Sequence, residues 1–465
     1  MVLASNGTRA PNLNSPKLSL VVALASLLLE GCIHAPLNQP LLAKAAPSMS
    51  QKTLENRGGE DDLMVALFFS GGGTRAASFS YGVLRELAAT QIKTPTRQYR
   101  LLDKVRAISA VSGGSFTAAY YCLYHDRIFS EFEDGFLKRN ITAGLTKAAI
   151  NPLHWSELLS PYYGRSDVAA EYYDKILFHG ATFGDLGENG GNPRLILNAT
   201  DMANGEQFPF VSEHFELIGS DLRSFRISRA IAAASAFPLL LSPVTLKNYR
   251  GEPGVLDPEV PSQDMSGDVS RRNVLVQDAF RSYGDYRNNP FIHLVDGGTS
   301  DNLGLEALID ADLEFGGMEK LIEQTLHAGP PRRFVVIVVN ASVHSSIRWS
   351  RTEAVPGIAS ELWRLAGDIG EHSDAEFLDL LRVSLARWKD ESAARPRDAK
   401  GRPEYYLISV DLDQLNAKAD GSFFEDLPTN FNLSSSTVDR IVGAGEHLLK
   451  ESPEYQRLVD DLSED

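Results

Sequence analysis

A serine in the sequence AVSGG at residues 110–114 lies between an apolar run and a helical pattern. A serine at such a strand-to-helix turn forms a nucleophile elbow, which exposes its hydroxyl above the sheet edge. The flanking residues are small because strand and helix approach closely, although Ala110 stands where the usual pattern has glycine. The segment predicts Ser112 as a nucleophile, the alternative being a glycine-rich turn with an idle serine.

An acid with two following glycines ends a second apolar segment, HLVDGG at residues 293–298. The glycines permit a sharp turn and leave the Asp296 carboxylate at the strand end, where sites form in open α/β sheets. This pattern predicts a catalytic acid. The alternative is an aspartate that only caps the following turn.

Three glycines in the segment SGGGTR, residues 70–75, follow another apolar run. Gly71, Gly72 and Gly73 would expose consecutive backbone N–H groups that suit an anion. A nucleotide P-loop is disfavoured because the segment lacks the G-x-x-x-x-G-K-[ST] pattern. An oxyanion hole is the other interpretation, in which one good donor contributes about 3–4 kcal/mol. Arg75 either adds positive charge there or holds the loop through a salt bridge.

The elements that position these residues are apolar runs separated by helical patterns. Buried strands are predicted at residues 65–69, 105–111, 195–197 and 334–339, and a further strand at residues 405–410. Alternation of such strands with helices predicts an α/β fold with a mostly parallel central sheet covered on both sides. Ser436 and Asp439 further predict a capping box at the start of a last helix.

The body of the protein is predicted as one domain over residues 61–465. Two stretches interrupt its α/β pattern. Residues 138–192 are rich in aromatics, proline and glycine, and residues 245–290 are polar. We interpret both as insertions that leave the core, one as a lid and one as a rim.

The N-terminal segment has the features of a secretory signal. Its apolar run is about twelve residues long, too short for a membrane-spanning helix of about twenty. It ends in LEGC at residues 29–32, which resembles a bacterial lipobox. The resemblance implies removal of residues 1–31 and a multiply acylated Cys32 that anchors the protein stably. An ordinary cleaved signal is the alternative.

Residues 32–60 are predicted to be a flexible tether, because they contain prolines and small polar residues without apolar periodicity. Ile33 follows the cysteine in place of the aspartate associated with inner-membrane retention. We therefore expect a lipid-anchored protein of the cell envelope, at the outer membrane.

Composition excludes several classes of function. The chain has 45 basic and 61 acidic residues and a formal net charge of −16, so a basic nucleic-acid footprint is absent. We find no metal-ligand cluster and expect no cofactor. Cys122 lies in an apolar helical pattern and is predicted to be a buried, inert thiol.

The glycine loop, the serine elbow and the D-G-G segment, in that order, resemble the patatin-like phospholipase family. Two further segments fit, NATD at residues 198–201 and ASAFP at residues 234–238. The resemblance covers about residues 62–340. It implies a three-layer α/β/α fold and a Ser112–Asp296 dyad.

The resemblance also implies that Gly71, Gly72 and Gly73 are oxyanion donors and that Gly113 adds a fourth. The implied substrates are phospholipids or other acyl esters, cleaved by a phospholipase A or lysophospholipase activity. A catalytic histidine is not expected, since His293 is three residues before Asp296 on a strand and faces the other side. Two alternatives stay open: a decayed lipid-binding or scaffolding lipoprotein, and an acyltransferase that uses the same site.

Overall fold

The computed structural model describes most of the chain from residue 63 onward. The described residues are 38–42, 63–94, 97–151, 160, 163–188, 193–238, 240–258, 271–315, 320, 331–343, 358–394, 402–415, 423–424, 427 and 429–464. The predicted signal peptide, Cys32 and most of the predicted tether lie outside them.

One mixed sheet forms the centre of the molecule, in the order β10-β9-β1-β4-β5-β8-β7, with β6 paired to β5. Its strands are β1 (Leu63–Phe69), β4 (Val105–Val111), β5 (Arg194–Asp201), β6 (Gln207–Pro209), β7 (Val244–Lys247), β8 (Phe291–Asp296), β9 (Arg333–Asn340) and β10 (Glu404–Asp411). Five neighbouring strands, from β10 to β5, run parallel. Strand β8 is antiparallel to both β5 and β7. A short antiparallel pair, β2 (Gln91–Lys93) and β3 (Gln98–Arg100), lies apart from this sheet.

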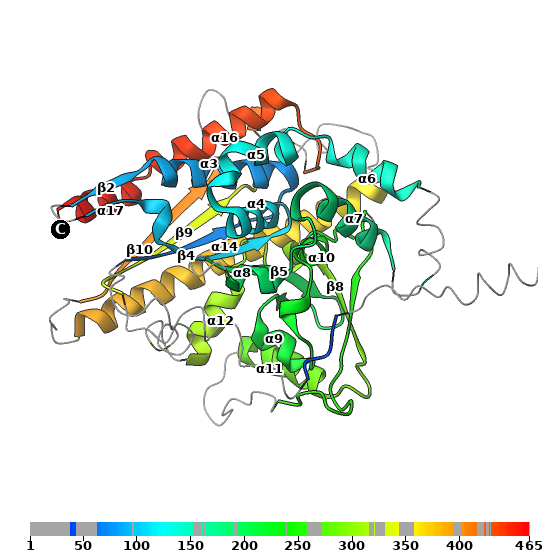
Figure 1. Ribbon diagram of the computed structural model, residues 1–465. Coiled ribbons are helices and arrows are strands. Elements are labelled where there is room, and N and C mark those ends of the chain that lie inside the picture. The colour runs from blue at the N-terminus through cyan, green and yellow to red at the C-terminus, as the bar shows by residue number, and fades with distance from the viewer. Residues whose placement is uncertain are drawn as a thin grey trace, which may run out of the picture.

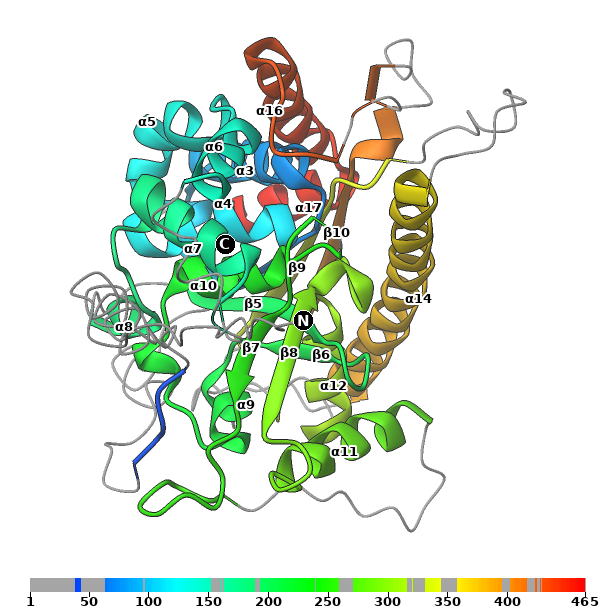
Figure 2. The same cartoon turned by 90° about the vertical axis from the view of Figure 1, so that its right-hand side faces the viewer.

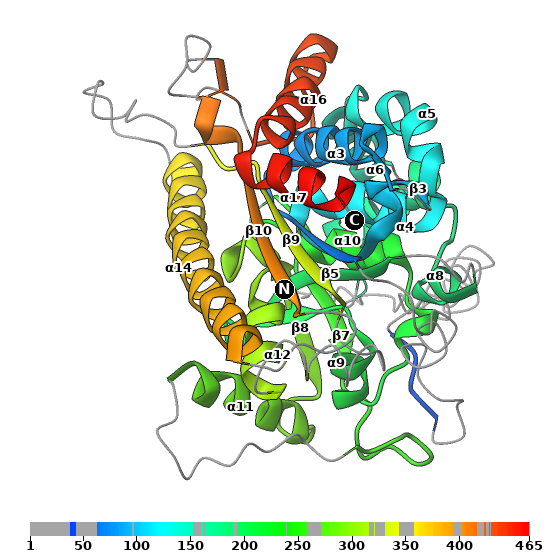
Figure 3. The same ribbon diagram turned by 90° about the vertical axis from the view of Figure 1, so that its left-hand side faces the viewer.

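Helices cover both faces of the sheet (Figure 1). On one face lie α3 (Gly73–Ala89), α4 (Ser112–Tyr124), α10 (Ile227–Ala234), α16 (Ser435–Lys450) and α17 (Pro453–Ser463). On the other lie α12 (Glu306–Phe315) and the long α14 (Ile358–Ala394). Figure 3 shows α14 and α3 on opposite sides of β9 and β10. This arrangement confirms the predicted α/β/α fold.

Alternate residues of the strands supply two separate cores. Leu67 and Phe69 of β1 pack with the helices that include α3 and α4. Ala66 and Phe68 point the other way and pack with α12 and α14. Successive strand side chains point to opposite faces, so a continuous apolar run is needed wherever both faces are covered. This explains why the central strands were recognisable from the sequence.

The region predicted as a lid, residues 138–192, contributes to the core where the structure describes it. It holds the helices α6 (Ile141–Ala149), α7 (Arg165–Tyr173) and α8 (Phe183–Glu188). Tyr173 at the end of α7 is fully buried, and its ring contacts that of Phe116 on α4 at 4.8 Å between centroids. Asp167 on α7 forms a buried ion pair with Arg229 on α10 at 3.0 Å. These helices are therefore packed parts of the domain.

The second predicted insertion supplies both an edge strand and a helix. Its described residues include β7 and α11 (Arg271–Gly284). Strand β7 pairs with β8 from Val244 to Lys247 and so completes the sheet beside the D-G-G segment. Two further short helices are α5 (Ile128–Phe132) and α9 (Ser212–Leu217). Among the described helices, none combines the length and the apolar character that crossing a bilayer requires.

Residues 38–42, inside the predicted tether, are fixed against the body (dark blue in Figure 2). Pro40 forms a β-bridge with Ser220, and Leu42 forms one with Val255. Asn38 is only 2% exposed. Its side-chain amide donates to the Lys247 carbonyl at 2.8 Å and accepts from the Lys247 N–H at 2.7 Å. The prediction of a wholly flexible tether is therefore wrong for this segment.

Replacing Asn38 by alanine should destabilise the protein by on the order of 1–3 kcal/mol, because buried partners lose their hydrogen bonds. The affected groups include the Lys247 backbone and the Ser220 hydroxyl, which accepts from Asn38 at 2.9 Å. The free energy of unfolding in urea would measure the loss. Gln39→Ala is the matched control, because the Gln39 side chain is exposed. Equal stability of the two variants would contradict a structural role for Asn38.

Candidate active site

The backbone of the serine elbow is strained. Strand β4 ends at Val111 and helix α4 begins at Ser112, whose φ is 44°. A non-glycine residue with positive φ is uncommon, and such strain costs on the order of 1–3 kcal/mol. A central strand and a buried helix hold Ser112 in this conformation. Ala110, the departure from the usual pattern, is fully buried in the core.

Strand β5 lies between β4, which leads into Ser112, and β8, which ends at Asp296, and it brings the two residues together. Strand β5 pairs with β4 through Val111 and Asn198, and with β8 through Ala199 and Asp296. The Ser112 Oγ lies 2.9 Å from the Asp296 Oδ2, in hydrogen-bonding distance. The two residues are 9% and 5% exposed. A hydroxyl and a carboxylate that are 184 positions apart thus form one buried pair.

Backbone contacts fix the position of the Asp296 carboxylate. Its Oδ1 accepts from the Gly298 N–H at 2.8 Å, so the residue also caps the turn that follows it. Its own N–H donates to the carbonyl of Ala236, just beyond the end of α10, at 3.1 Å. Burial raises the pKa of Asp296 to about 6, although the hydrogen bonds from Gly298 and Ser112 act in the opposite direction. Desolvation disfavours the charged form of a carboxylate.

The glycine loop lies directly beside the elbow. A Cβ added at Gly71 would lie 3.3 Å from the Ser112 Cβ. One added at Gly113 would lie 2.1 Å from the Gly73 carbonyl oxygen. Gly72 and Gly73 have φ values of 134° and 61°, which favour glycine. These close approaches explain why both segments consist of small residues.

Gly71 differs from our prediction as an oxyanion donor. Its N–H donates to the Asn302 carbonyl oxygen at 3.0 Å and is therefore already used. The amide groups of Gly73 and Gly113 are in the first turns of α3 and α4. First-turn N–H groups have no partner within their own helix. The donors that the geometry leaves for an anion are therefore those of Gly72, Gly73 and Gly113.

A methyl group at Gly113 should disrupt this loop. We expect Gly113→Ala to reduce the kcat/KM for ester hydrolysis by at least about 100-fold, comparable to loss of an oxyanion donor. The physical reason is the overlap of the new Cβ with the Gly73 backbone. Gly443→Ala in helix α16 is the control, since its Cβ would meet nothing within 4 Å. Wild-type activity in Gly113→Ala would show that the loop can move aside.

Arg75 links the glycine loop to residues near the C-terminal end of the chain. Its side chain is buried, and Nη1 donates to the Leu427 carbonyl oxygen at 3.0 Å. The neighbouring Thr74 N–H donates to the Asn430 carbonyl oxygen at 2.9 Å. Of the two predicted roles for Arg75, these contacts favour a structural one. The guanidinium ties Leu427 to the start of α3.

The other candidate groups lie away from the dyad. His293 is exposed, and its Nδ1 lies 3.0 Å from the Thr245 Oγ1 on β7. Cys122 is fully buried in α4, and burial raises the pKa of its thiol. Within the described part of the chain, no three His, Cys, Asp or Glu residues are grouped to hold a metal ion.

Two residues near the site, Asp301 and Asn302, were not predicted from the sequence. Asp301 is fully buried and accepts hydrogen bonds from the backbone of Leu303, Gly304 and Glu306. Asn302 accepts from Gly71 and donates through its side chain to Asp374 on α14 at 3.0 Å. Together they fix the loop after Asp296 against the glycine loop. Two adjacent polar residues this close to the D-G-G segment could have indicated that they support the site.

Comparison with known proteins identifies the family of this chain. The family model described as "Patatin-like phospholipase" matches residues 67–309. No curated protein matches the chain.

Solved structures with a similar fold include human GIVD cytosolic phospholipase A2. That structure has a TM-score of 0.46 and 13% sequence identity, over 93% of this chain and 68% of that one. The same human protein in complex with methyl gamma-linolenyl fluorophosphonate gives 0.40 and 11%, over 89% of this chain and 62% of that one. Because the family model covers more than half of the 465 residues, the chain belongs to the patatin-like phospholipase family, a membership that supports lipid acyl hydrolase activity.

Proposed function

We propose that this protein cleaves fatty-acyl esters of lipids, as a phospholipase A or lysophospholipase, through a Ser112–Asp296 dyad. The observation that carries the proposal is the 2.9 Å contact between the Ser112 Oγ and the Asp296 Oδ2. It is supported by the strained backbone at Ser112 and by the adjacent glycine loop.

The reaction proceeds through an acyl-enzyme. Asp296 accepts the proton of Ser112 as the Oγ attacks the ester carbonyl, and the alcohol part of the lipid leaves with a proton. Asp296 then activates a water molecule, which attacks the acyl-enzyme and releases the fatty acid. A base is most effective when its pKa is close to the working pH. Burial raises the pKa of Asp296 toward such a pH, to about 6.

The tetrahedral intermediates are stabilised by backbone donors. We expect the N–H groups of Gly72, Gly73 and Gly113, in the loop beside Ser112, to donate to the oxyanion. Preorganised donors of this kind act where charge develops in the transition state. Arg75 contributes by holding the loop.

Activity should rise with pH through about 6, because only the ionised Asp296 can accept the serine proton. Well below that value, kcat/KM should fall about tenfold per pH unit. Stopped-flow or plate assays with a soluble p-nitrophenyl ester between about pH 4 and about pH 8 would measure the profile. A midpoint near the ordinary aspartate pKa of about 3.9 would contradict the desolvated base.

Stability should change in the opposite direction over this range. Burial raises the pKa values of Asp296 and of Asp301 to about 6. The folded state therefore binds more protons than the unfolded state between about pH 4 and about pH 6. The contribution of these acids to stability is greatest below that window and is lost as the pH rises through it. Reduced activity at low pH would thus not reflect their effect on unfolding.

A fluorophosphonate probe together with lipid product analysis tests the proposed function. The purified protein should be labelled at Ser112 and should release fatty acid from phospholipid or lysophospholipid vesicles. Labelling without fatty-acid release, but with acyl products when an alcohol is added, would indicate an acyltransferase. The absence of both labelling and turnover would indicate a decayed lipid-binding protein.

We also propose that a lipid on Cys32 anchors the enzyme to the cell envelope, at the outer membrane. The LEGC segment at residues 29–32 and Ile33 support this proposal. Cys32→Ala should release the protein from the membrane fraction on sucrose-gradient separation. Recovery of the wild-type protein in the inner-membrane fraction would contradict the outer-membrane placement.

A further inference from the structure

The glycine loop is held at its first residues by segments that are far away in the sequence. The Gly71 N–H donates to the Asn302 carbonyl oxygen at 3.0 Å. The preceding Ser70 is fully buried. Its N–H donates to the Val339 carbonyl oxygen at 3.1 Å, and its hydroxyl oxygen accepts from the Ala341 N–H at 2.8 Å. Strand β9 therefore fixes one side of the loop start, and Asn302 fixes the other.

Both N–H groups of the Asn302 side-chain amide are used in hydrogen bonds. They donate to the Asp374 Oδ2 at 3.0 Å and to the Ser342 Oγ at 3.2 Å. An asparagine amide has two N–H donors and one carbonyl oxygen, so that oxygen points the other way. A Cβ added at Gly71 would overlap it, and one added at Gly298 would lie 3.1 Å from it. The Asn302 Oδ1 thus occupies the space between the glycine loop and the D-G-G turn.

The two glycines that contact this oxygen lie beside the reacting groups. The Cβ added at Gly71 would be 3.3 Å from the Ser112 Cβ. The one added at Gly298 would be 3.2 Å from the Asp296 Oδ1. Asn302 therefore touches the loop next to the nucleophile and the turn next to the base. A displacement of its side chain would change the spacing of these two segments.

Asp374 is well placed to prevent such a displacement. It belongs to α14 and is only 4% exposed. Phe377, one turn further along this helix, packs in the core with Phe68 of β1, the strand that leads into the glycine loop. The Ser342 hydroxyl also lies 3.4 Å from the Asp374 Oδ2. Asp374 thus lies on the side of Asn302 that faces away from the glycine loop, on a helix that is packed against the sheet.

We propose that Asp374 and Asn302 are positioning residues for ester hydrolysis. Asp374 fixes the Asn302 amide, and Asn302 fixes the spacing between the glycine loop and the D-G-G turn. The oxyanion donors follow Gly71 directly in the chain, so their direction depends on this spacing. The inference rests on the proposed dyad reaction, in which a displacement of about 1 Å can cost about 100-fold in rate.

Steady-state kinetics test the role of Asp374. In Asp374→Ala, kcat on a soluble p-nitrophenyl ester should fall about tenfold, whereas KM should stay within about twofold of the wild-type value. Asp374→Asn keeps an oxygen that can accept from Asn302, so its kcat should lie within about threefold of the wild-type value. An unchanged kcat in Asp374→Ala, or a loss that appears only in KM, would overturn the inference.

A double variant tests whether Asp374 acts through Asn302. Asn302→Ala should reduce kcat/KM by about 100-fold, because it removes the amide that separates the two segments. Adding Asp374→Ala to this variant should cause no further loss, since residues that act through one contact are not additive. Losses that multiply in the double variant would mean that the two residues act independently, which would overturn the inference.

An alkyl trifluoromethyl ketone separates an effect on the oxyanion donors from a loss of folded protein. The Ser112 Oγ bonds to its carbonyl carbon, the serine proton passes to Asp296, and the carbonyl oxygen becomes the oxyanion. Because the adduct resembles the tetrahedral intermediate, its dissociation constant should rise about tenfold in Asp374→Ala. Asn302→Ala should show a parallel change, which keeps the inference testable if Asp374→Ala does not fold. An unchanged dissociation constant per folded protein would overturn it.

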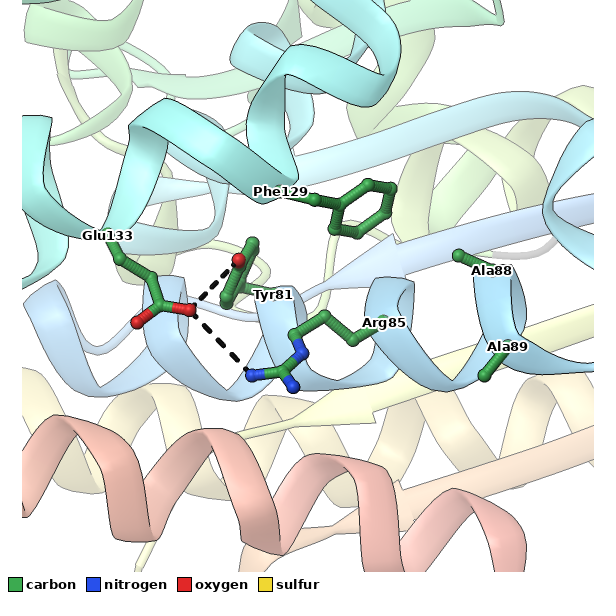
Figure 4. A pocket seen from close by; sticks show the side chains of 6 residues that line it. All are labelled: Tyr81, Arg85, Ala88, Ala89, Phe129 and Glu133. Carbon is green, nitrogen blue, oxygen red and sulfur yellow. Dashed lines mark hydrogen bonds and ion pairs between the residues drawn. The ribbon is translucent and has the colours of Figure 1, made fainter.

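Tyr81→Phe is the matched control, in the hollow shown in Figure 4. Tyr81 belongs to α3, the helix that begins in the glycine loop, and is 1% exposed. Its hydroxyl donates to the Glu133 Oε1 at 3.0 Å, the same length as the bond from Asn302 to Asp374. The substitution removes one such bond further along the helix, away from the loop. The kcat and the dissociation constant of the ketone should therefore keep their wild-type values.

Hydrogen exchange followed by mass spectrometry tests the position of the loop without any turnover. The Gly71 N–H is protected by its bond to Asn302. In Asp374→Ala, a peptide that covers residues 70–75 should take up deuterium faster than in the wild-type protein or in Tyr81→Phe. Unchanged exchange in this peptide would overturn the inference. A wild-type protein that hydrolyses no ester would instead count against the proposed function, and the exchange measurement would still decide whether Asp374 positions the loop.

Discussion

Ser112→Ala should reduce ester hydrolysis by roughly 10⁴-fold or more, because no acyl-enzyme forms without the hydroxyl. The fold should be unchanged, since alanine keeps the Cβ and removes only the Oγ. The values of kcat/KM on a p-nitrophenyl ester and on phospholipid vesicles would measure the loss. Circular dichroism and the unfolding midpoint in urea would establish that the variant is folded.

Ser115→Ala is the matched control for this variant. Ser115 lies one turn further along α4, is fully buried, and its Oγ has no hydrogen-bond partner within the described residues. Its removal should leave kcat/KM close to the wild-type value. Retention of more than a few per cent of activity in Ser112→Ala would remove this serine from the mechanism.

Asp296→Asn should reduce kcat/KM by at least about 10³-fold while it preserves the shape of the site. The amide oxygen still accepts from the Gly298 N–H, and the amide nitrogen can donate to the Ser112 Oγ. What is lost is the ability to take the serine proton. Unlike the wild-type enzyme, the remaining activity should show no titration near pH 6.

The same substitution should stabilise the protein at neutral and higher pH. Because burial raises the pKa of Asp296 to about 6, its ionised form opposes folding. Removing the charge should therefore add on the order of 2 kcal/mol to the free energy of unfolding at about pH 8.

Asp201→Asn is the comparison variant for the pH dependence of kcat/KM and for the free energy of unfolding. Asp201 is another buried acid of the sheet with a raised pKa, and it bonds to the Tyr283 hydroxyl, away from Ser112. Its replacement should leave the pH–rate profile in place. Full activity in Asp296→Asn would mean that another group takes the proton.

The central sheet and the two segments that bring Ser112 and Asp296 into contact could be predicted because their signals are local. The runs that became β1, β4 and β9 are largely apolar, since both faces of these strands are covered. The elbow at Ser112 and the turn after Asp296 each need glycines within a few residues, so each is complete in one short segment.

Features that depend on distant partners could not be predicted. Gly71 was expected to be an oxyanion donor, but its N–H is used by Asn302, a residue 231 positions later in the chain. Asn38 lies in a stretch that has the composition of a linker, yet its amide bonds to the backbone of Lys247. Nothing near either residue in the sequence indicates such a partner.

A local signal for a helix start can also fit more than one neighbouring residue as the N-cap. The last long helix was expected to begin at a capping box formed by Ser436 and Asp439. In the structure the cap is Ser434, whose Oγ accepts from the Thr437 N–H at 3.1 Å, and Ser436 lies inside the helix. Adjacent serines offer equivalent caps, so packing of the helix decides which one is used.

The docked residues 38–42 limit how the enzyme can sit on a bilayer, if Cys32 carries the proposed lipid. Six peptide units separate residue 32 from Asn38, and a fully extended chain of that length reaches only about 20 Å. A tether that was free up to residue 60 would reach roughly 95 Å. The edge of the sheet that contains β7 would therefore stay closer to the lipid head groups than the thickness of the membrane's own hydrocarbon layer, about 30 Å. Rotation of the protein on the surface would then be restricted, and one side of it would face lipid in almost every orientation.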